Sequence, residues 1–85
     1  MVKIADRIEV DPKVHHGKPV IAGTRVPVHM ILGLLGNSVS SEQILHDYYD
    51  NITKEDILAC IQYAHSLVEE EEVYAVGSID DQGRG

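Results

Sequence analysis

The most densely punctuated stretch of the chain is Gly17-Lys18-Pro19-Val20-Ile21-Ala22-Gly23-Thr24-Arg25-Val26-Pro27-Val28, which runs directly into an apolar segment from His29 to Leu35. Residues 17 to 27 contain two glycines and two prolines. Glycine adopts positive φ angles at little cost and proline holds φ at about −65°, so together they restrict the backbone. The segment therefore predicts a shaped loop, whose structural residues are Gly17, Pro19, Gly23, Thr24 and Pro27.

The charges of this loop are all positive. Lys18 and Arg25 are its only charged residues, and no Asp or Glu lies between Lys13 and Glu42. A cationic turn of the backbone is a suitable contact for an anion or a protein partner, so we expect Lys18 and Arg25 to bind the partner. The alternative is a rigid surface connector whose charges are merely solvated.

The chain before the loop predicts one short strand. Residues 7 to 10 alternate polar and apolar side chains, the period of a half-buried strand, and Asp11-Pro12 ends it with a turn. Because a strand needs a partner, we expect pairing with residues 19 to 21, with residues 25 to 28, or with a second chain. Residues 1 to 6 are expected to be loosely held.

The chain after the loop predicts two helices in succession. Pro27 is compatible with a helix start and Gly36-Asn37 with a left-handed stop, which places the first helix at about residues 28 to 35. Ser40 and Gln43 have the spacing of a capping box, which opens a second helix to about Tyr49. The side chains of this second helix that can face inward are Ile44, Leu45 and Tyr48.

A third, longest helix follows the cap residue Thr53. Its apolar residues recur at helical spacing and are expected to face the core: Ile57, Leu58, Ile61, Ala64, Leu67 and Val68. The expected fold is thus mainly α, with a short N-terminal β element followed by a three-helix bundle that contains a helix-turn-helix pattern.

A helix-turn-helix can place its last helix in the major groove of DNA. However, the positions left for solvent on the third helix include Glu55, Asp56, Gln62 and Glu69, and its only cation is Lys54. Acids at such a surface repel phosphates. The pattern therefore favours a structural role for these helices, and a DNA-binding transcriptional regulator is the alternative function.

Several of these motifs resemble a known family. The motifs are Arg7-Ile8-Glu9-Val10-Asp11-Pro12, Gly17-Lys18-Pro19-Val20-Ile21, Gly23-Thr24-Arg25-Val26-Pro27-Val28, and Thr53-Lys54-Glu55-Asp56-Ile57 followed by Tyr63-Ala64. They are similar to the small prokaryotic family catalogued as domain of unknown function 433, and the resemblance covers roughly residues 7 to 68. It implies a homeodomain-like helical bundle after the β element, and a role as the antitoxin-type partner of a PIN-like nuclease toxin.

Length and composition indicate one small domain. The chain has 85 residues, 44% of them hydrophobic, and it lacks Phe and Trp, so aliphatic side chains and four Tyr must fill the core. We expect a single domain over residues 1–76 and a disordered tail over residues 77–85. A single cysteine, Cys60, and the lack of a secretory or membrane-spanning segment predict a cytoplasmic protein.

Charge divides the chain into two parts. Residues 1–25 carry five cations and three acids, a net charge of +2, whereas residues 26–85 carry two cations and eleven acids, a net charge of −9. This distribution argues against strong nonspecific binding of nucleic acid and favours a basic protein partner. The acidic run at the end of the third helix and the tyrosine after it are expected to bind that partner: Glu69, Glu70, Glu71, Glu72 and Tyr74. The alternative is a solvated helix end.

No catalytic or cofactor site is expected. Cys60 lies in an apolar helix stripe, and the five histidines are scattered without a nucleophile or carboxylate pattern. His15 and His16 are adjacent, so on a strand they point to opposite sides, and no second pair at i, i+4 spacing accompanies them. We therefore expect no metal and no cofactor, and a binding module rather than an enzyme.

The first helix indicates a homodimer. Six of its eight residues are apolar, more than the single stripe that a small monomeric domain covers. The strand indicates the same, because pairing across a two-fold axis satisfies its edge. The dimer interface is expected to include Ile8, Val10, Met30 and Leu34.

Overall fold

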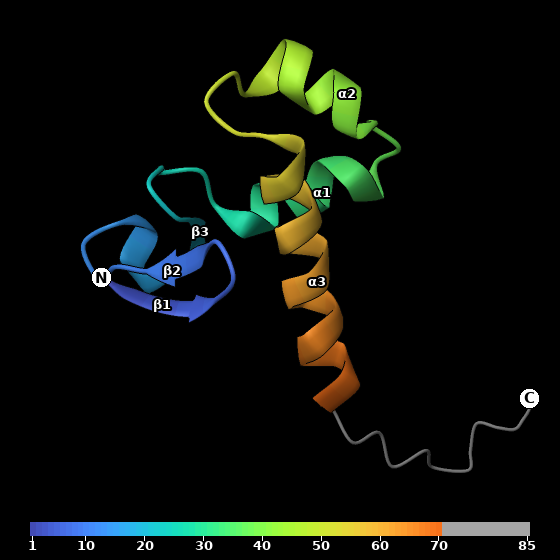
Figure 1. The fold of residues 1–85 in the computed structure, drawn as a ribbon. Coiled ribbons are helices and arrows are strands. Elements are labelled where there is room, and N and C mark those ends of the chain that lie inside the picture. The colour runs from blue at the N-terminus through green and yellow to red at the C-terminus, as the bar shows by residue number, and fades with distance from the viewer. Residues whose placement is uncertain (71–85) are drawn as a thin grey trace, which may run out of the picture.

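The computed structural model describes residues 1–70 and shows a three-stranded antiparallel sheet followed by three helices (Figure 1). The strands are β1 (Val2–Ala5), β2 (Ile8–Val10) and β3 (Val20–Ile21), in the spatial order β1-β2-β3. The expected fold class, a short β element before a mainly helical bundle, is confirmed. The expected tail, residues 77–85, lies outside the described residues.

The sheet contains the predicted strand and one of its predicted partners. β2 pairs with β3, with Ile8 opposite Ile21 and Glu9 opposite Val20. The expectation that residues 1 to 6 are loosely held is wrong, because β1 pairs with β2. Arg7 adopts a φ of 64° in the tight turn between these two strands.

The loop after β3 is held by its own hydrogen bonds. The backbone N–H of Ile21 donates to the carbonyl of Val26 (2.9 Å). The hydroxyl of Thr24 donates to the carbonyl of Ile21 (2.8 Å) and accepts from the N–H of Val26 (3.0 Å). Gly23, with a φ of +80°, donates its N–H to Oε2 of Glu9 (3.2 Å). Thr24 and Gly23 thus close the loop that they were expected to shape.

The first helix, α1 (Val28–Gly36), begins directly after Pro27, as predicted. It ends one residue later than predicted, and the left-handed residue that stops it is Ser38 (φ 69°), not Gly36 or Asn37. The N–H of Val39 donates to the carbonyl of Leu34 (3.0 Å), which closes the last turn.

Replacing Gly23 by Val should lower the free energy of unfolding by about 1 kcal/mol or more, because a β-branched residue is strained at positive φ. No described atom lies within 4 Å of the added Cβ, so the cost comes from the backbone alone. Thermal unfolding followed by circular dichroism measures it. The control is Gly33→Ala, a helical glycine with equally open surroundings, which should melt at or above the wild-type temperature. Equal melting of Gly23→Val and wild type would contradict the prediction.

The second helix consists of α2 (Ser41–Gln43) and a π-helical turn, η2 (Ile44–Tyr48). Ser40 caps it, because its hydroxyl accepts the N–H of Gln43 (3.1 Å). Ile44 is buried as expected, but Tyr48 is half exposed instead of facing inward. The reason is the π turn, whose extra residue per turn shifts the side chains that follow it.

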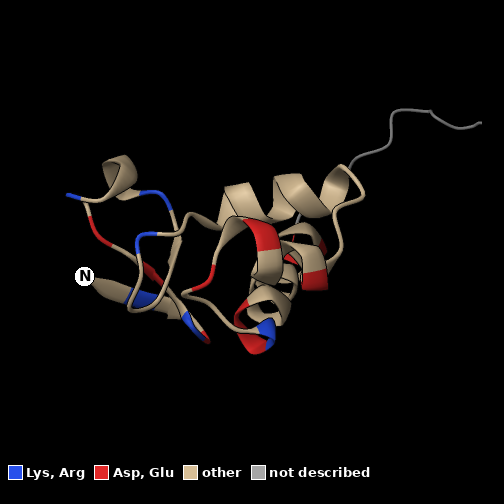
Figure 2. Ribbon diagram, turned by 90° about the horizontal axis from the view of Figure 1, so that it is seen from above, with Lys and Arg blue, Asp and Glu red and all other residues tan. Residues whose placement is uncertain are grey.

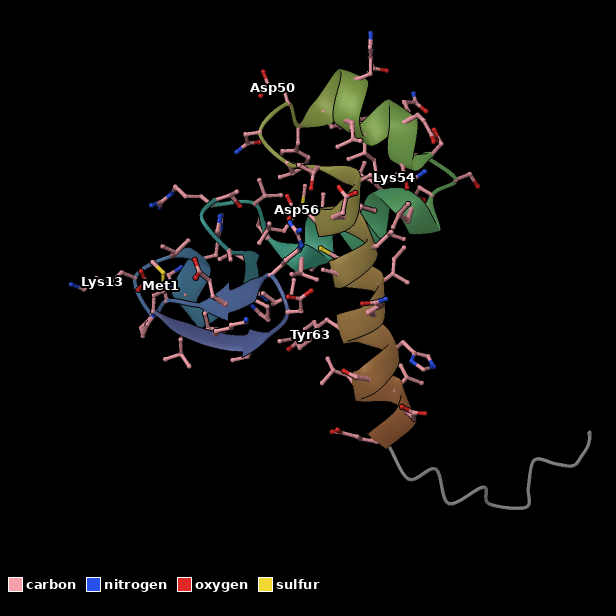
Figure 3. All side chains as sticks on the ribbon, viewed as in Figure 1. Met1, Lys13, Asp50, Lys54, Asp56 and Tyr63 are labelled. Carbon is pink, nitrogen blue, oxygen red and sulfur yellow. The ribbon has the colours of Figure 1, made fainter. Side chains whose placement is uncertain are left out.

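The third helix, α3 (Lys54–Glu70), starts with a reciprocal cap. The N–H of Asp56 donates to Oγ1 of Thr53 (3.2 Å), and the N–H of Thr53 donates to Oδ2 of Asp56 (2.9 Å). The other carboxylate oxygen of Asp56 pairs with the guanidinium of Arg7 (3.1 Å). Asp56 is therefore buried, contrary to the sequence expectation, and joins the β1-β2 turn to the start of α3 (Figure 3).

The core between the sheet and the helices is aliphatic. Its fully buried side chains are Ile8, Val20, Ile21, Ile31, Ile44, Ile57 and Cys60. Four residues of α3 that were expected to face inward are exposed instead: Leu58 (48%), Ile61 (41%), Leu67 (48%) and Val68 (65%). The sheet and the other helices cover only one side of α3 near its start, and its C-terminal half projects beyond them (Figure 1).

The apolar residues of α1 are mostly covered by the same chain. Ile31 is buried and Leu34 is half-buried against the core, whereas Met30 is 44% exposed. Ile8 has no exposed surface, because β3 and the helices cover β2, so its expected place in a dimer interface is wrong. Val10 is half-buried at the end of β2. Met30 is therefore the one largely exposed apolar side chain of α1.

Candidate partner-binding site

Two hollows share the side chain of His29, in the first turn of α1. The first hollow has a volume of about 530 Å³ and is lined by His15, Arg25, Val26, Pro27, His29, Met30, Tyr49 and Asn51. The second hollow has a volume of about 330 Å³ and is lined by Lys18, Pro19, Val28, His29, Leu32, Tyr63 and Leu67. The loop over residues 17–28 contributes to both, and α3 contributes to the second.

The first hollow depends on an unusual backbone turn. His15, His16 and Gly17 all have positive φ (50°, 56° and 80°). Nε2 of His15 donates to the carbonyl of Arg25 (2.9 Å), which ties the turn to the loop ten residues later. Non-glycine residues at positive φ are strained and are held there only by their surroundings. The side chain of His15 therefore positions the backbone of Arg25 beside the hollow.

The lining of both hollows is free of carboxylates and carries positive charge. Arg25 lines the first hollow and Lys18 the second, and neither forms an ion pair within residues 1–70. Pro27, directly before α1, provides no side-chain cap, so the positive end of the helix dipole adds to this field. Each hollow is therefore suited to a negatively charged group.

Most of the lining is nevertheless apolar. Val26, Met30 and the ring of Tyr49 form walls of the first hollow, and Leu32 and Leu67 form walls of the second. Tyr63 lies on the side of α3 that faces the sheet (Figure 3). Such a surface matches a partner that offers an apolar side chain next to a carboxylate. This combination is typical of protein–protein interfaces rather than of protein–DNA interfaces.

Two of the acidic residues expected to bind the partner lie close to the second hollow. Glu69 and Glu70 are exposed at the end of α3, within one turn of Leu67. Glu71, Glu72 and Tyr74 lie outside the described residues. Figure 2 shows Lys and Arg mainly over the sheet and its loops, where the acids Asp6, Glu9 and Asp11 also lie. The helices carry mainly Asp and Glu, and Lys54 is their exception.

Sequence reasoning found the cations of this site but missed half of its walls. Leu67 and Tyr63 lie far from the loop in sequence, and Leu67 was assigned to the core. His29 and Asn51 carried no pattern of their own. The only available signal for His29 was its position in the first turn after Pro27, where a side chain lies beside the loop.

Neither the cysteine nor the metal-ligand residue types form a metal-binding group in the described part of the chain. Cys60 is buried, and burial together with nearby Asp56 raises the pKa of its thiol from 9.0 to about 11, so it stays protonated at neutral pH. Within residues 1–70, no three His, Cys, Asp or Glu side chains converge in a way that could hold a metal ion. None of the helices in this part of the chain is long and apolar enough to cross a membrane.

Comparison with protein families identifies the chain. Residues 8–64 match the family described as protein of unknown function (DUF433). The chain belongs to the DUF433 family. No curated protein and no solved structure gives a significant match to this DUF433 chain. The matched residues include β2, the loop, α1 and most of α3, so the hollows lie within the family's own segment apart from Leu67.

Proposed function

We propose that this protein is a non-catalytic binding module of the antitoxin type, which binds and neutralises a PIN-like nuclease. The nuclease contacts the two hollows around His29 and is attracted by the acidic end of α3. The nuclease partner is the one implied by the motifs that resemble the DUF433 family. The contact surface is inferred from the charges and shapes of residues 1–70.

The observation that supports a protein partner over DNA is the composition of the helical surface. Residues 26–70 contain seven acids and one cation, Lys54, which pairs with Glu42 (3.9 Å). Affinity for phosphates comes from Lys and Arg that displace condensed counterions. A helix-turn-helix with this charge is unsuited to DNA, whereas an acidic surface next to apolar hollows suits a basic protein.

The two hollows assign separate roles to their residues. Leu32, Tyr63 and Leu67 in the second hollow accept an apolar side chain of the nuclease. Arg25 and Lys18 pair with carboxylates at the edge of the same contact, which fixes the orientation of the two proteins. Exposed Glu69 and Glu70 act at longer range and mainly accelerate encounter.

A DNA-binding regulator is the second candidate, and one observation favours it. The five cations of residues 1–25 lie over the sheet and its loops (Figure 2). If the protein is a DNA-binding regulator, its contacts to DNA come from the sheet and the loop rather than from α3.

Two assays on the full chain separate these candidates. The first mixes it with the purified protein encoded by the neighbouring gene and measures whether RNA cleavage by that protein is inhibited. The second is a gel shift with the DNA upstream of its own gene. Inhibition at stoichiometric amounts, with no shift at physiological salt, supports the proposal. A specific shift without inhibition supports the regulator instead.

Replacing Glu69 to Glu72 by Gln should slow association with the nuclease by up to about tenfold at low salt and flatten the salt dependence of its rate. The dissociation rate should change little, because exposed charges steer encounter over roughly one Debye length. Stopped-flow mixing at several salt concentrations measures both rates. Glu42→Gln, an exposed acid elsewhere on the helices, is the control. If neither the replacement nor the salt concentration changes the association rate, the prediction is wrong and the acidic run is only a solvated helix end.

A further inference from the structure

One face of α3 carries a row of exposed apolar side chains that the proposed function does not use. We call Leu58, Ile61, His65 and Val68 the α3 stripe. They are spaced by three, four and three residues, so at about 100° per residue they share one side of the helix. Its three aliphatic members are 48%, 41% and 65% exposed, respectively.

The α3 stripe is separate from the second hollow. Leu67 and Tyr63, which line that hollow, lie on the side of the helix that faces the core, with the buried Cys60, whereas the stripe lies on the other side. α3 therefore has apolar side chains on two sides, of which the core-facing one is partly covered. One side forms a wall of the hollow, and the other is open along the part of the helix that projects beyond the sheet (Figure 1).

The charges at the ends of the stripe favour a second copy of this chain in the antiparallel direction. Lys54, whose pair with Glu42 is long (3.9 Å) and exposed, lies one turn before Leu58, and Glu69 and Glu70 directly follow Val68. An antiparallel pair brings the lysine end of each helix to the glutamate end of the other. A parallel pair instead places all four of these glutamates together, at the end where both helix dipoles are negative.

The spacing of the stripe fits the same arrangement. The α3 stripe is symmetric about residue 63, so a two-fold axis there sets Leu58 opposite Val68 and Ile61 opposite His65. Every aliphatic side chain of the stripe then faces a side chain of the stripe in the other copy. Spacings of three and four residues, as in this stripe, are usual along the seam between two helices.

We propose that the protein forms a homodimer through the α3 stripe, with the two α3 helices antiparallel. This replaces the contact through α1 and β2 that the sequence indicated. It leaves the hollows around His29 of both copies open for the partner.

The first test is the oligomeric state of the full chain, measured by sedimentation velocity over a range of concentrations. Wild type should be dimeric, and Ile61→Glu should raise the dimer dissociation constant by at least about a hundredfold, because the substitution enters the interface twice. The control is Leu67→Glu, which adds the same charge at a similarly exposed residue on the other side of α3 and should remain dimeric. Circular dichroism must show that both variants are folded.

The second test addresses direction. Lys54→Glu should weaken the dimer by about tenfold, and adding Glu69→Lys and Glu70→Lys should restore it, since each copy then again offers opposite charges. A monomeric wild type would overturn the proposal, and so would a dimer that Ile61→Glu leaves intact. A dimer that Ile61→Glu breaks but Lys54→Glu leaves unchanged would overturn the antiparallel arrangement. These measurements do not involve the nuclease, so they test the dimer independently of the proposed function.

Discussion

Replacement of Asp56 by Ala is expected to lower the free energy of unfolding by about 2 to 4 kcal/mol. Its carboxylate accepts the N–H of Thr53 (2.9 Å) and pairs with Arg7 (3.1 Å), while the residue is only 9% exposed. The substitution removes a helix cap, typically worth about 1 kcal/mol, and a hydrogen bond to a charged group worth about 1.5 to 3 kcal/mol. It also leaves the N–H of Thr53 without its acceptor.

Urea unfolding at neutral pH measures this effect. Glu55→Ala is the matched control, because Glu55 is an exposed acid in the same turn of α3. It should change the free energy of unfolding by only a few tenths of a kcal/mol. Arg7→Ala should cost less than Asp56→Ala, since Arg7 is half exposed and the cap to Thr53 survives. If Asp56→Ala and Glu55→Ala unfold at the same urea concentration, Asp56 does not join the sheet to α3 in the way described.

If the proposed nuclease partner pairs a carboxylate with Arg25, replacement of Arg25 by Ala is expected to weaken its binding by about 2 to 5 kcal/mol, because truncating one side of an interfacial ion pair leaves the other charge unpaired. The fold should be unaffected. The side chain of Arg25 is exposed, and the bond that positions this residue runs from His15 to its backbone carbonyl, which the substitution preserves.

Isothermal titration calorimetry with the nuclease measures this loss. Lys13→Ala is the control, because Lys13 is an exposed cation near the loop that lines neither hollow. It should bind within about 0.5 kcal/mol of wild type. Equal losses for Arg25→Ala and Lys13→Ala would mean that only the overall charge of the loop side matters, and not the first hollow.

Local patterns in the sequence were sufficient for most of the fold. The caps Ser40 and Thr53 and the helix start after Pro27 act through neighbouring backbone groups, so short motifs identify them. β1 was missed because its apolar residues Val2 and Ile4 are exposed, and only the bonds to β2 reveal it.

Periodicity could not decide which sides of α3 are covered. A helix with apolar residues on several sides gives the same spacing whether its neighbours cover one side or all of them. For this reason Asp56, which was expected at the surface, is buried. Three apolar residues that were expected in the core are exposed: Leu58, Ile61 and Val68. The hollows around His29 join the loop to Tyr63 and Leu67, a contact set by tertiary packing that no local motif encodes.

The most direct test of the partner surface is an NMR titration. The amide signals of the isotope-labelled full chain are followed while the unlabelled protein encoded by the neighbouring gene, the proposed nuclease, is added. The proposed function predicts that the largest changes fall on the loop over residues 17–28, the first turn of α1 and the turn of α3 around Tyr63 and Leu67. Changes confined to α2, η2 and the first turn of α3, or changes that upstream DNA produces and the nuclease does not, would contradict it.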